Sequence, residues 1–418
     1  MSPLNHKSAI LIIGGGTWGC SAALQLARRG HRRIKVLDSS RFPSPSAAGN
    51  DINKIAEEAN LPFENDSDKD YAWNRIHQLA MDAWKHDPLY APFYHPTGFI
   101  MSACGSEAYN QVLKYVSGRE SQFMTLRNAA DFRATMPKGI LTGDFPQWRG
   151  FWQKDGAGWV FARGALEAIH AEAERLGVEF VAGSLQGKVE ALLYSDDGFT
   201  ILGARTTDGA QHIADQTILA AASTNRVDRW YTKTYQFSSM PSAASSSNQT
   251  DASNHEMKIC DEHPGYCNFV RVNGELRSVP FVRQQIPLEA EQRMRRLLHE
   301  SMPTLESHEF SFARVCWDAD TVDRLFLIDR HPKYAGLVLA VGGSGHGFMT
   351  MPAAGIIVAD VLEGILETRL RTMLRWRPET AVDRNWQDTQ DRFGADGKVM
   401  DFRDVRKWTQ IRGDDAKL

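Results

Sequence analysis

The sequence predicts an α/β fold, because its N-terminal region has the pattern of a strand, a helix and a second parallel strand. Residues 9–13 form a short apolar run that is rich in β-branched side chains, the composition of a buried parallel strand. After a glycine-rich turn, apolar side chains recur at helical spacing until Gly30, where we expect the helix to stop. A second apolar run at residues 34–37 completes the predicted βαβ unit.

The first turn has the glycine spacing of a dinucleotide-binding loop, which lets a backbone approach a pyrophosphate. The residues expected at this loop are Gly14, Gly16, Thr17, Trp18 and Gly19. Asp38 follows the second strand, 24 residues after Gly14, where a carboxylate can bond ribose hydroxyls. With strand, helix, second strand and acid in place, we favour dinucleotide binding over the alternative, an ordinary glycine-rich βα turn.

The composition is that of a globular protein with more than one domain. The chain has 418 residues, of which 42% are hydrophobic, and a formal net charge of -3. At this length we expect two interleaved domains. The charge gives no basic excess for nucleic acid, and no apolar run is long enough to suggest a membrane span. Because the first strand begins so early, we expect no signal peptide.

The five cysteines predict a reduced protein without a disulfide framework. Their number is odd and they are scattered along the chain, which fits a reducing compartment. Cys260 and Cys267 lack the partners of a zinc site. We therefore expect no bound metal.

The middle of the chain has the element order of a glutathione-reductase-like flavoprotein. Residues 162–176 have one apolar helical face, and residues 178–181 follow as a strand. Two alternating stretches at residues 189–194 and 199–204 predict an antiparallel meander. The apolar residues 217–221 then predict a strand that closes the first sheet near the pyrophosphate.

A second strand, glycine turn and helix are predicted at residues 336–341, 342–347 and 352–366. The N-terminus of this helix is expected to face the pyrimidine edge of a flavin and to stabilise the negative charge gained on reduction. Residues 239–254 are a low-complexity, linker-like segment. The aromatic residues within 57–150 build a core or wall a ligand cavity.

Several motifs in order resemble the fungal amadoriases, which are fructosyl amino acid oxidases of the monomeric sarcosine oxidase group of flavoenzymes. The similarity extends over nearly the whole chain apart from about residues 225–254. The motifs are the Gly-Gly-Gly-Thr-Trp-Gly of residues 14–19, the Ala-Gly-Asn-Asp-Ile-Asn-Lys of residues 48–54, and residues 258–266, 316–321, 385–388 and 399–402.

The resemblance implies a discontinuous, glutathione-reductase-like FAD-binding domain and a second, mostly antiparallel β substrate domain. The expected FAD-binding domain is residues 8–55, 150–225 and 310–370. The substrate domain is residues 56–149 and 226–309, and residues 371–418 form a C-terminal extension. By the same resemblance, residues on the second glycine turn contact the cofactor: Gly345, His346, Gly347, Phe348 and Met349.

The resemblance also gives roles to single residues. Cys316 matches the cysteine that holds FAD through a thioether to its 8α methyl, against the plain alternative of a buried small hydrophobe. Lys258, which we expect on a strand, matches the lysine over the flavin that stabilises superoxide during reoxidation. Lys54 falls near the flavin edge. Glu262 and Arg392 match the pair that grips the substrate, where the alternative for each is a surface charge.

Three departures from the family pattern bear on the substrate. Met349 stands where the family has a lysine that contributes to carboxylate binding. The segment before Lys258 is shorter than in the family and of low complexity. The sheet-closing strand runs into Ala220 and Ala221, where the family has a glycine beside the pyrophosphate.

We therefore expect an FAD-dependent oxidase that breaks the C–N bond of a secondary amine. For a fructosyl amino acid, the products are amino acid, glucosone and hydrogen peroxide. The alternatives are an amine oxidase of secondary metabolism that acts on an N-methyl or cyclic amine, and a flavin-binding protein with little turnover. The expected partners are the small-molecule amine and O2, and the protein is expected to be a monomer.

The last three residues, Ala416, Lys417 and Leu418, are a near-variant of the Ser-Lys-Leu peroxisomal address. This similarity gains weight if the reaction makes peroxide. We expect either import into peroxisomes by the import receptor or a cytoplasmic location.

Overall fold

The chain divides into two compact units. Unit 1 is residues 1–94, 160–231 and 318–384, and unit 2 is residues 95–159, 232–317 and 385–418. The computed structural model describes residues 6–45, 47–221, 257–261, 266–272, 274–280, 283–310, 312–317, 319–321, 323–381 and 400–409.

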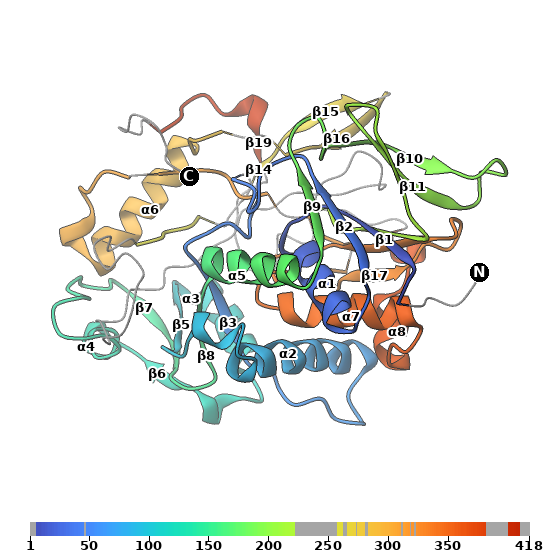
Figure 1. The fold of residues 1–418 in the computed structure, drawn as a ribbon. Helices are drawn as coiled ribbons and strands as arrows, with labels where there is room; N and C mark the ends of the chain where they lie inside the picture. The colour runs from blue at the N-terminus through green and yellow to red at the C-terminus, as the bar shows by residue number, and fades with distance from the viewer. Residues whose placement is uncertain are drawn as a thin grey trace. The chain divides into compact units, whose positions relative to one another are not determined.

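Unit 1 is built on a six-stranded sheet (Figure 1). Its strands are β1 (Ala9–Ile13), β2 (Arg33–Asp38), β9 (Glu179–Ala182), β13 (Gln216–Leu219), β17 (Leu327–Arg330) and β18 (Leu337–Val341). They lie in the order β17-β18-β13-β1-β2-β9. All neighbours are parallel except the edge pair β17 and β18. Ile12 of β1 is in register with Val36 of β2 and with Ile218 of β13.

The two faces of this sheet are covered by different elements, because successive side chains of a strand point to opposite sides. Ile10 and Ile12 belong to the apolar cluster that includes the helices, whereas Leu11 and Ile13 pack with Ala204 of the meander. The helices of that cluster are α1 (Thr17–Arg28), α2 (Asp68–His86), α5 (Ala162–Arg175), α7 (Met351–Glu363) and α8 (Thr368–Leu374). The meander is β10 (Val189–Tyr194), β11 (Ile201–Thr206) and β12 (Gln211–Ile213).

Helix α1 packs closely against α7, and a glycine makes this approach possible. A Cβ atom added at Gly355 of α7 would lie 2.4 Å from the Oγ of Ser21 and 2.5 Å from its carbonyl oxygen. The Ser21 hydroxyl donates to the carbonyl oxygen of Met351 at 2.7 Å. The two helices that follow the two glycine turns are therefore fixed to each other.

Unit 2 contains smaller sheets, most of them antiparallel. One sheet has β7 (Trp148–Gln153) between β5 (Phe99–Cys104) and β6 (Met124–Leu126), both antiparallel to it. A hairpin pairs β15 (Phe269–Val272) with β16 (Glu275–Ser278). The exception is the parallel pair of β14 (Tyr266–Cys267) and β19 (Met400–Asp401). The helices of this unit are α3 (Ser106–Val116), α4 (Ala129–Arg133) and α6 (Leu288–Ser301).

The remaining elements are short. Two-residue to five-residue strands are β3 (Asn53–Glu57), β4 (Tyr94–His95) and β8 (Ala157–Phe161). The 3-10 turns are η1 (Ala91–Phe93), η2 (Glu120–Gln122), η3 (Pro303–Leu305), η4 (Pro378–Ala381) and η7 (Phe402–Asp404).

The predicted fold class is confirmed: unit 1 has the expected βαβ unit, meander and closing strand, and antiparallel sheets are present in unit 2. The helix after the second glycine turn, α7, was predicted at 352–366 but ends at Glu363. Gly364 has φ +75° and supplies the left-handed residue that terminates a helix. The expectation of a strand at Lys258 is wrong, because residues 257–261 are irregular.

The division into units also differs from the expected domain boundaries at 55 and 56. Helix α2 was expected in the substrate domain but lies in unit 1, because its buried face joins the helices of that unit. The indole of Trp84 on α2 donates to the carbonyl oxygen of Met349 at 2.7 Å. The expected extension at 371–418 is split, with residues up to 384 in unit 1.

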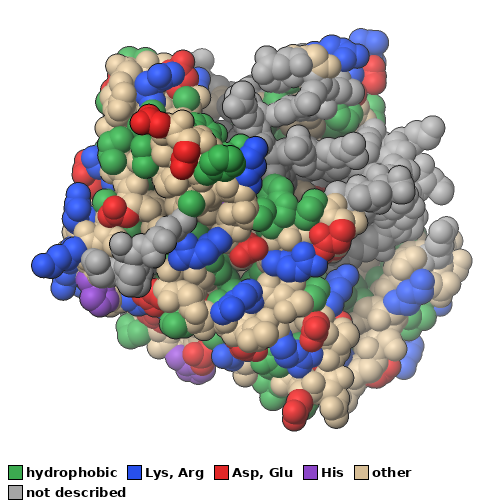
Figure 2. Space-filling model, turned by 90° about the vertical axis from the view of Figure 1, so that its right-hand side faces the viewer, with side chains coloured by type: hydrophobic (Ala, Val, Ile, Leu, Met, Phe, Trp, Pro, Cys, Tyr) green, Lys and Arg blue, Asp and Glu red, His purple; other side chains and the backbone are tan. Residues whose placement is uncertain are grey.

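Charges are mixed on the surface drawn in Figure 2, where Lys and Arg side chains (blue) alternate with Asp and Glu (red). This distribution agrees with the small net charge of -3. Among the described residues, no helix is both long and apolar enough to cross a lipid bilayer. In the same part of the chain, no group of three or more His, Cys, Asp or Glu side chains could hold a metal ion.

Candidate nucleotide and active site

The first glycine turn is closely packed at Gly14 and Gly19 and open at Gly16. A Cβ atom at Gly14, where φ is +102°, would lie 2.9 Å from the carbonyl oxygen of Ala220. At Gly19 it would lie 1.8 Å from the carbonyl oxygen of Gly14. At Gly16, no atom of the described residues lies within 4 Å of such a Cβ atom. The backbone at Gly16 thus has space for a ligand, while Gly14 and Gly19 are glycines because the backbone packs closely on itself there.

The N-terminus of α1 presents backbone N–H groups beside this opening. The first backward hydrogen bond runs from the Cys20 N–H to the carbonyl oxygen of Gly16, 3.0 Å away. The N–H groups of Thr17, Trp18 and Gly19 therefore have no intrahelical acceptor. Helix α1 has no side-chain cap and no acidic residue in its first turn. This arrangement suits a pyrophosphate, because N–H groups and the helix dipole both favour an anion.

Asp38 lies at the carboxyl end of β2 and is tied to the glycine turn. Its Oδ2 accepts from the Gly15 N–H at 2.9 Å, and its Oδ1 accepts from the Ser40 N–H at 2.9 Å. Burial raises the pKa of the Asp38 carboxyl, and these two hydrogen bonds act in the opposite direction. The carboxylate is therefore oriented by the turn itself, as a ribose-binding acid requires.

A loop before β3 lies against the same turn. A Cβ atom at Gly49 would lie 2.3 Å from the Oγ1 of Thr17, so any other residue here would displace the Thr17 side chain. The ammonium group of Lys54 lies 2.8 Å from Asp51 Oδ2, and both side chains are largely buried. The Asp51 carbonyl oxygen accepts the Arg163 N–H at 2.9 Å, which fixes the loop to the start of α5.

The second glycine turn is joined to the first by a tryptophan. Trp18 Nε1 donates to the carbonyl oxygen of Gly347 at 2.8 Å, and its ring packs edge-on against Phe326 at 4.9 Å. A Cβ atom at Gly347 would lie 3.1 Å from the Cα of Gly343 and 3.5 Å from Trp18 Nε1. The two turns predicted to contact one cofactor are therefore held side by side in unit 1.

The second turn also presents backbone donors. His346, Thr350 and Met351 donate their N–H groups to carbonyl oxygens within the turn. Over the described residues, no acceptor contacts the N–H groups of the four other positions, Gly345, Gly347, Phe348 and Met349. Successive N–H groups of this kind form a site for an oxygen atom that carries negative charge.

The side chains of Phe348 and Met349 are buried in the apolar cluster of unit 1. Trp84 stacks near Phe348, with ring centroids 6.2 Å apart. Met349 is 8% exposed. A lysine at this position would place its stem among apolar side chains, so the departure from the family pattern at Met349 agrees with its surroundings.

Lys258 and Cys316 lie in unit 2 and are both half-buried. Ile259 packs against the apolar cluster that contains Trp317, the neighbour of Cys316. Asp261 accepts two hydrogen bonds from Arg293 of α6, at 2.9 and 2.6 Å. The irregular segment that carries Lys258 is therefore fixed on one side by packing and on the other by an ion pair. The predicted substrate residues Glu262 and Arg392 lie outside the described residues.

Comparison with known proteins gives the family. The model of the DAO family, FAD dependent oxidoreductase, matches residues 9–361. The solved structure of the fructosyl amine: oxygen oxidoreductase (Amadoriase I) of Aspergillus fumigatus has 45% sequence identity and a TM-score of 0.91, covering 99% of this chain and 100% of that chain. The chain belongs to the FAD-dependent oxidoreductases, within the amadoriase group.

Two further relatives agree with this assignment. The fructosamine oxidase (Amadoriase II) of Aspergillus fumigatus is 39% identical with a TM-score of 0.89, covering 99% of both chains. The L-saccharopine oxidase of Schizosaccharomyces pombe is 24% identical over 448 residues, covering 95% of this chain and 98% of its own length. The predicted resemblance to the fungal amadoriases is confirmed.

FAD is the cofactor of this family, and the residues of unit 1 fit it. The open backbone at Gly16 and the uncapped start of α1 suit its pyrophosphate, and the oriented carboxylate of Asp38 suits its ribose. No sequence pattern predicts the ion pair of Asp51 with Lys54 or the contact of Gly49 with Thr17. These contacts do not follow from the spacing of apolar residues along the chain. Gly49 and Asp51 nevertheless belong to the motif of residues 48–54, one of those that carry the resemblance to the amadoriases.

We expect Asp38→Ala to weaken FAD binding at least tenfold. The change removes the acceptor for ribose and also frees the Gly15 N–H, and hydrogen bonds to a charged group contribute about 1.5–3 kcal/mol each. Binding is measured by titrating FAD onto apoprotein that also carries Cys316→Ala, so that no thioether can form there. Asp155→Ala, at an exposed position of unit 2, is the control. Equal affinities of the two variants would contradict the role of Asp38.

Proposed function

We propose that the chain, as a monomer, oxidises the C–N bond of a fructosyl amino acid. The observation that carries this proposal is the 45% identity, over the full length of both chains, to a solved fructosyl amine: oxygen oxidoreductase. The nucleotide site of unit 1 supports it, because this oxidation needs a two-electron acceptor and a bound flavin would supply one.

The reaction balances as a two-electron oxidation followed by hydrolysis. The secondary amine loses two electrons and two protons and becomes an imine, and water cleaves the imine to a carbonyl compound and a free amine. Bound FAD would supply the electron acceptor for this step, and O2 would take up the two electrons and two protons and leave as hydrogen peroxide. For a fructosyl amino acid, the two organic products are glucosone and the amino acid.

The contribution of this chain is binding and orientation rather than strong base chemistry. The start of α1 and the open side of Gly16 would hold the pyrophosphate, and Asp38 the ribose. Lys54 and Asp51 form a neutral pair beside this site, so they add polar atoms without adding net charge. Glu262 and Arg392 are proposed to bind the amine and the carboxylate of the substrate.

A second candidate is an amine oxidase that acts on an N-methyl or cyclic amine without a carboxylate. Met349 favours it, because the family lysine that contributes to carboxylate binding is replaced here by a buried apolar side chain. The two candidates differ in the ligand that Arg392 would bind.

A peroxide-coupled screen tests both candidates. We expect peroxide from fructosyl-valine or fructosyl-lysine, with loss of at least tenfold in kcat/KM when the substrate carboxylate is esterified, because a charge-assisted hydrogen bond is removed. Arg392→Met should reduce the preference for the free carboxylate, while Arg371→Met, on the exposed face of α8, should leave it unchanged. Turnover of N-methyl amines alone would favour the second candidate, and a yellow protein without turnover would refute both.

We further propose that FAD is attached covalently through Cys316. The resemblance supports this attachment, as does the position of Cys316 between the buried residues Val315 and Trp317, which restrict its backbone. A thioether to the flavin needs a thiol that is not fully enclosed by protein, and Cys316 is half-buried.

If the attachment is covalent, the acid-precipitated protein stays yellow and its band fluoresces on a denaturing gel. Cys316→Ala should release all flavin into the supernatant, whereas Cys104→Ala, at an exposed cysteine of the same unit, should retain it. Release of the flavin from the unmodified protein on denaturation would refute the attachment.

We propose Lys258 as the residue that promotes reoxidation of the flavin by O2. A fixed ammonium stabilises the superoxide formed by the first electron transfer, and such a charge is effective when its position is set before the reaction. Packing of Ile259 and the ion pair of Asp261 with Arg293 support a fixed position for the segment.

Lys258→Met should slow reoxidation about 10²–10³-fold while leaving anaerobic reduction by substrate within a few-fold, because a preorganised charge is lost. Stopped-flow absorbance measures the two half-reactions separately. Lys154→Met, an exposed lysine of unit 2, serves as the control. A parallel loss in both half-reactions would make Lys258 a binding or folding residue.

We propose import into peroxisomes, supported by the tail Ala416, Lys417 and Leu418 and by a reaction that makes peroxide. A fluorescent protein fused at the N-terminus should give puncta that overlap a peroxisomal marker. Deletion of Leu418 should make the signal diffuse, and deletion of the neighbouring Asp414 should not. Diffuse fluorescence of the intact fusion would refute import.

A further inference from the structure

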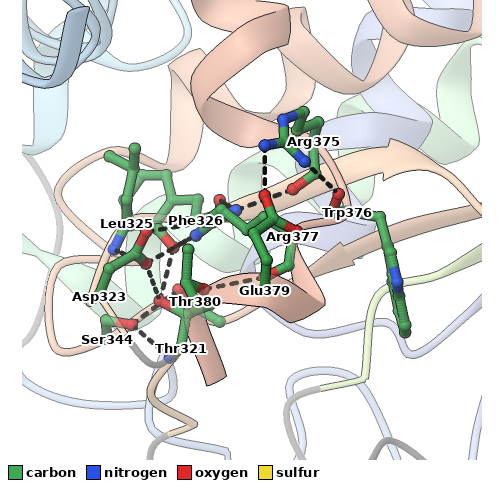
Figure 3. A network of polar contacts seen from close by, with 11 residues as sticks. Thr321, Asp323, Leu325, Phe326, Ser344, Arg375, Trp376, Arg377, Glu379 and Thr380 are labelled. Atoms are coloured by element: carbon green, nitrogen blue, oxygen red, sulfur yellow. Dashed lines mark hydrogen bonds and ion pairs between the residues drawn. The ribbon is translucent and has the colours of Figure 1, made fainter. Parts of the chain in front are cut away.

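A buried arginine after α8 closes a polar network in unit 1 (Figure 3). The Arg377 side chain is 7% exposed, and its Nε and Nη2 each lie 2.8 Å from an oxygen of the Asp323 carboxylate. Its other N–H groups donate to the carbonyl oxygens of Leu325 at 2.5 Å, Phe326 at 3.1 Å and Arg375 at 3.0 Å. All five donors of the guanidinium are thereby used.

The ion pair in this network is neutral as a whole. Burial raises the pKa of the Asp323 carboxyl, but the hydrogen bonds and charge of Arg377 more than offset this, so its pKa lies below the ordinary value. Asp323 is therefore ionised and balances the charge of Arg377. An effect of this pair on a neighbouring site would come from geometry and not from net charge.

Thr321 connects the ion pair to the second glycine turn. Its hydroxyl donates to the carbonyl oxygen of Leu325 at 2.6 Å and lies 3.2 Å from Asp323 Oδ1. Its N–H donates to the Oγ of Ser344 at 3.0 Å, and the Ser344 hydroxyl donates to the carbonyl oxygen of Gly342 at 3.0 Å. Thus Thr321, Asp323 and Leu325 lie between Arg377 and the turn.

Ser344 has a backbone conformation that is uncommon for a residue other than glycine. Its φ is +47°, and the residue is fully buried. Its N–H donates to the carbonyl oxygen of Ala319 at 3.1 Å, and its own carbonyl oxygen accepts from Arg324 Nη2 at 3.0 Å and His346 Nδ1 at 2.9 Å. A strained residue persists where its surroundings determine it from several sides.

The direction of the backbone after Ser344 decides where the donors of the turn point. Gly345, Gly347, Phe348 and Met349 follow directly, and their N–H groups have no acceptor among the residues that the structure describes. A rotation at Ser344 would redirect the Gly345 N–H first and would displace the later groups less, because Trp18 and Trp84 also hold the carbonyl oxygens of Gly347 and Met349. N–H groups preorganised toward developing negative charge stabilise it strongly, and misplaced groups do not.

We propose that Arg377 is a positioning residue for the flavin: through Asp323, Thr321 and Ser344 it sets the orientation of the N–H groups at 345–349, and so favours the reduced, negatively charged cofactor. This inference rests on the proposed flavin site. All five N–H donors of Arg377 are used within the protein, so Arg377 would not bind the cofactor itself. It would affect the redox equilibrium of the cofactor only through the residues that it positions.

The test measures the two-electron reduction potential of the purified holoenzyme by dye-coupled titration. Arg377→Lys keeps the positive charge but replaces the planar guanidinium, which has five N–H donors, by a single ammonium group. We expect the equilibrium to shift at least tenfold toward oxidised flavin, which is about 30 mV for a two-electron couple. Arg375→Lys is the matched control, because Arg375 lies two residues away and its side chain pairs with Glu379 at the surface.

Ser344→Ala provides a second variant in case Arg377→Lys does not fold. It removes both hydrogen bonds of the Ser344 hydroxyl and leaves the ion pair of Arg377 with Asp323 in place. We expect a shift of the same sign, and Ser344→Gly, which accepts a positive φ without strain, should shift the potential at least as far. A change in melting temperature alone, with the potential of wild type, would identify a purely structural role.

The outcomes separate this inference from the proposed function. A flavin-loaded wild type together with unshifted potentials in Arg377→Lys and Ser344→Ala would overturn the inference alone. A wild type that binds no FAD would overturn the proposed flavin site and this inference with it. A shift in both variants, absent from Arg375→Lys, would support it.

Discussion

The close contact between α1 and α7 is the constraint on which the nucleotide site depends. It requires Gly355, because any side chain there would overlap Ser21, and it is fixed by the hydrogen bond from Ser21 to Met351. The same contact brings Trp18 to the carbonyl oxygen of Gly347. Two glycine turns that are far apart in the sequence thereby become one surface. Without this approach, each turn would present its N–H groups to a different region of space.

Much of unit 1 could be predicted from the sequence, because its signals are local and periodic. The apolar strands, the glycine spacing and Asp38 gave the βαβ unit, and the meander and closing strand followed the expected order. The end of α7 was misplaced by three residues, since apolar periodicity continues past Gly364 to Leu366 while the backbone turns at the glycine. The spacing of apolar residues predicts which side chains are buried, and Leu366 is buried although it lies beyond the end of α7.

What the sequence could not reveal are polar contacts between distant segments. Arg377 and Asp323 have no spacing that marks them as partners, and a serine with a positive φ has no compositional signal. The strand expected at Lys258 failed for a related reason. Met257 and Ile259 alternate with the lysine, but the segment is fixed by the ion pair of Asp261 with Arg293 of α6 and by side-chain packing of Ile259. It therefore needs no neighbouring strand.

The discontinuity of unit 1 has a consequence for biosynthesis. Trp18 and Gly347 are 329 residues apart, so the partner of α1 leaves the ribosome long after α1 itself. Until α7 is made, the side of α1 that carries Ser21 lacks the helix against which it packs. Domains that fold as units during synthesis ordinarily begin at the N-terminus. Here the core of unit 1 cannot be completed until α7, near the C-terminal end of the chain, has been translated.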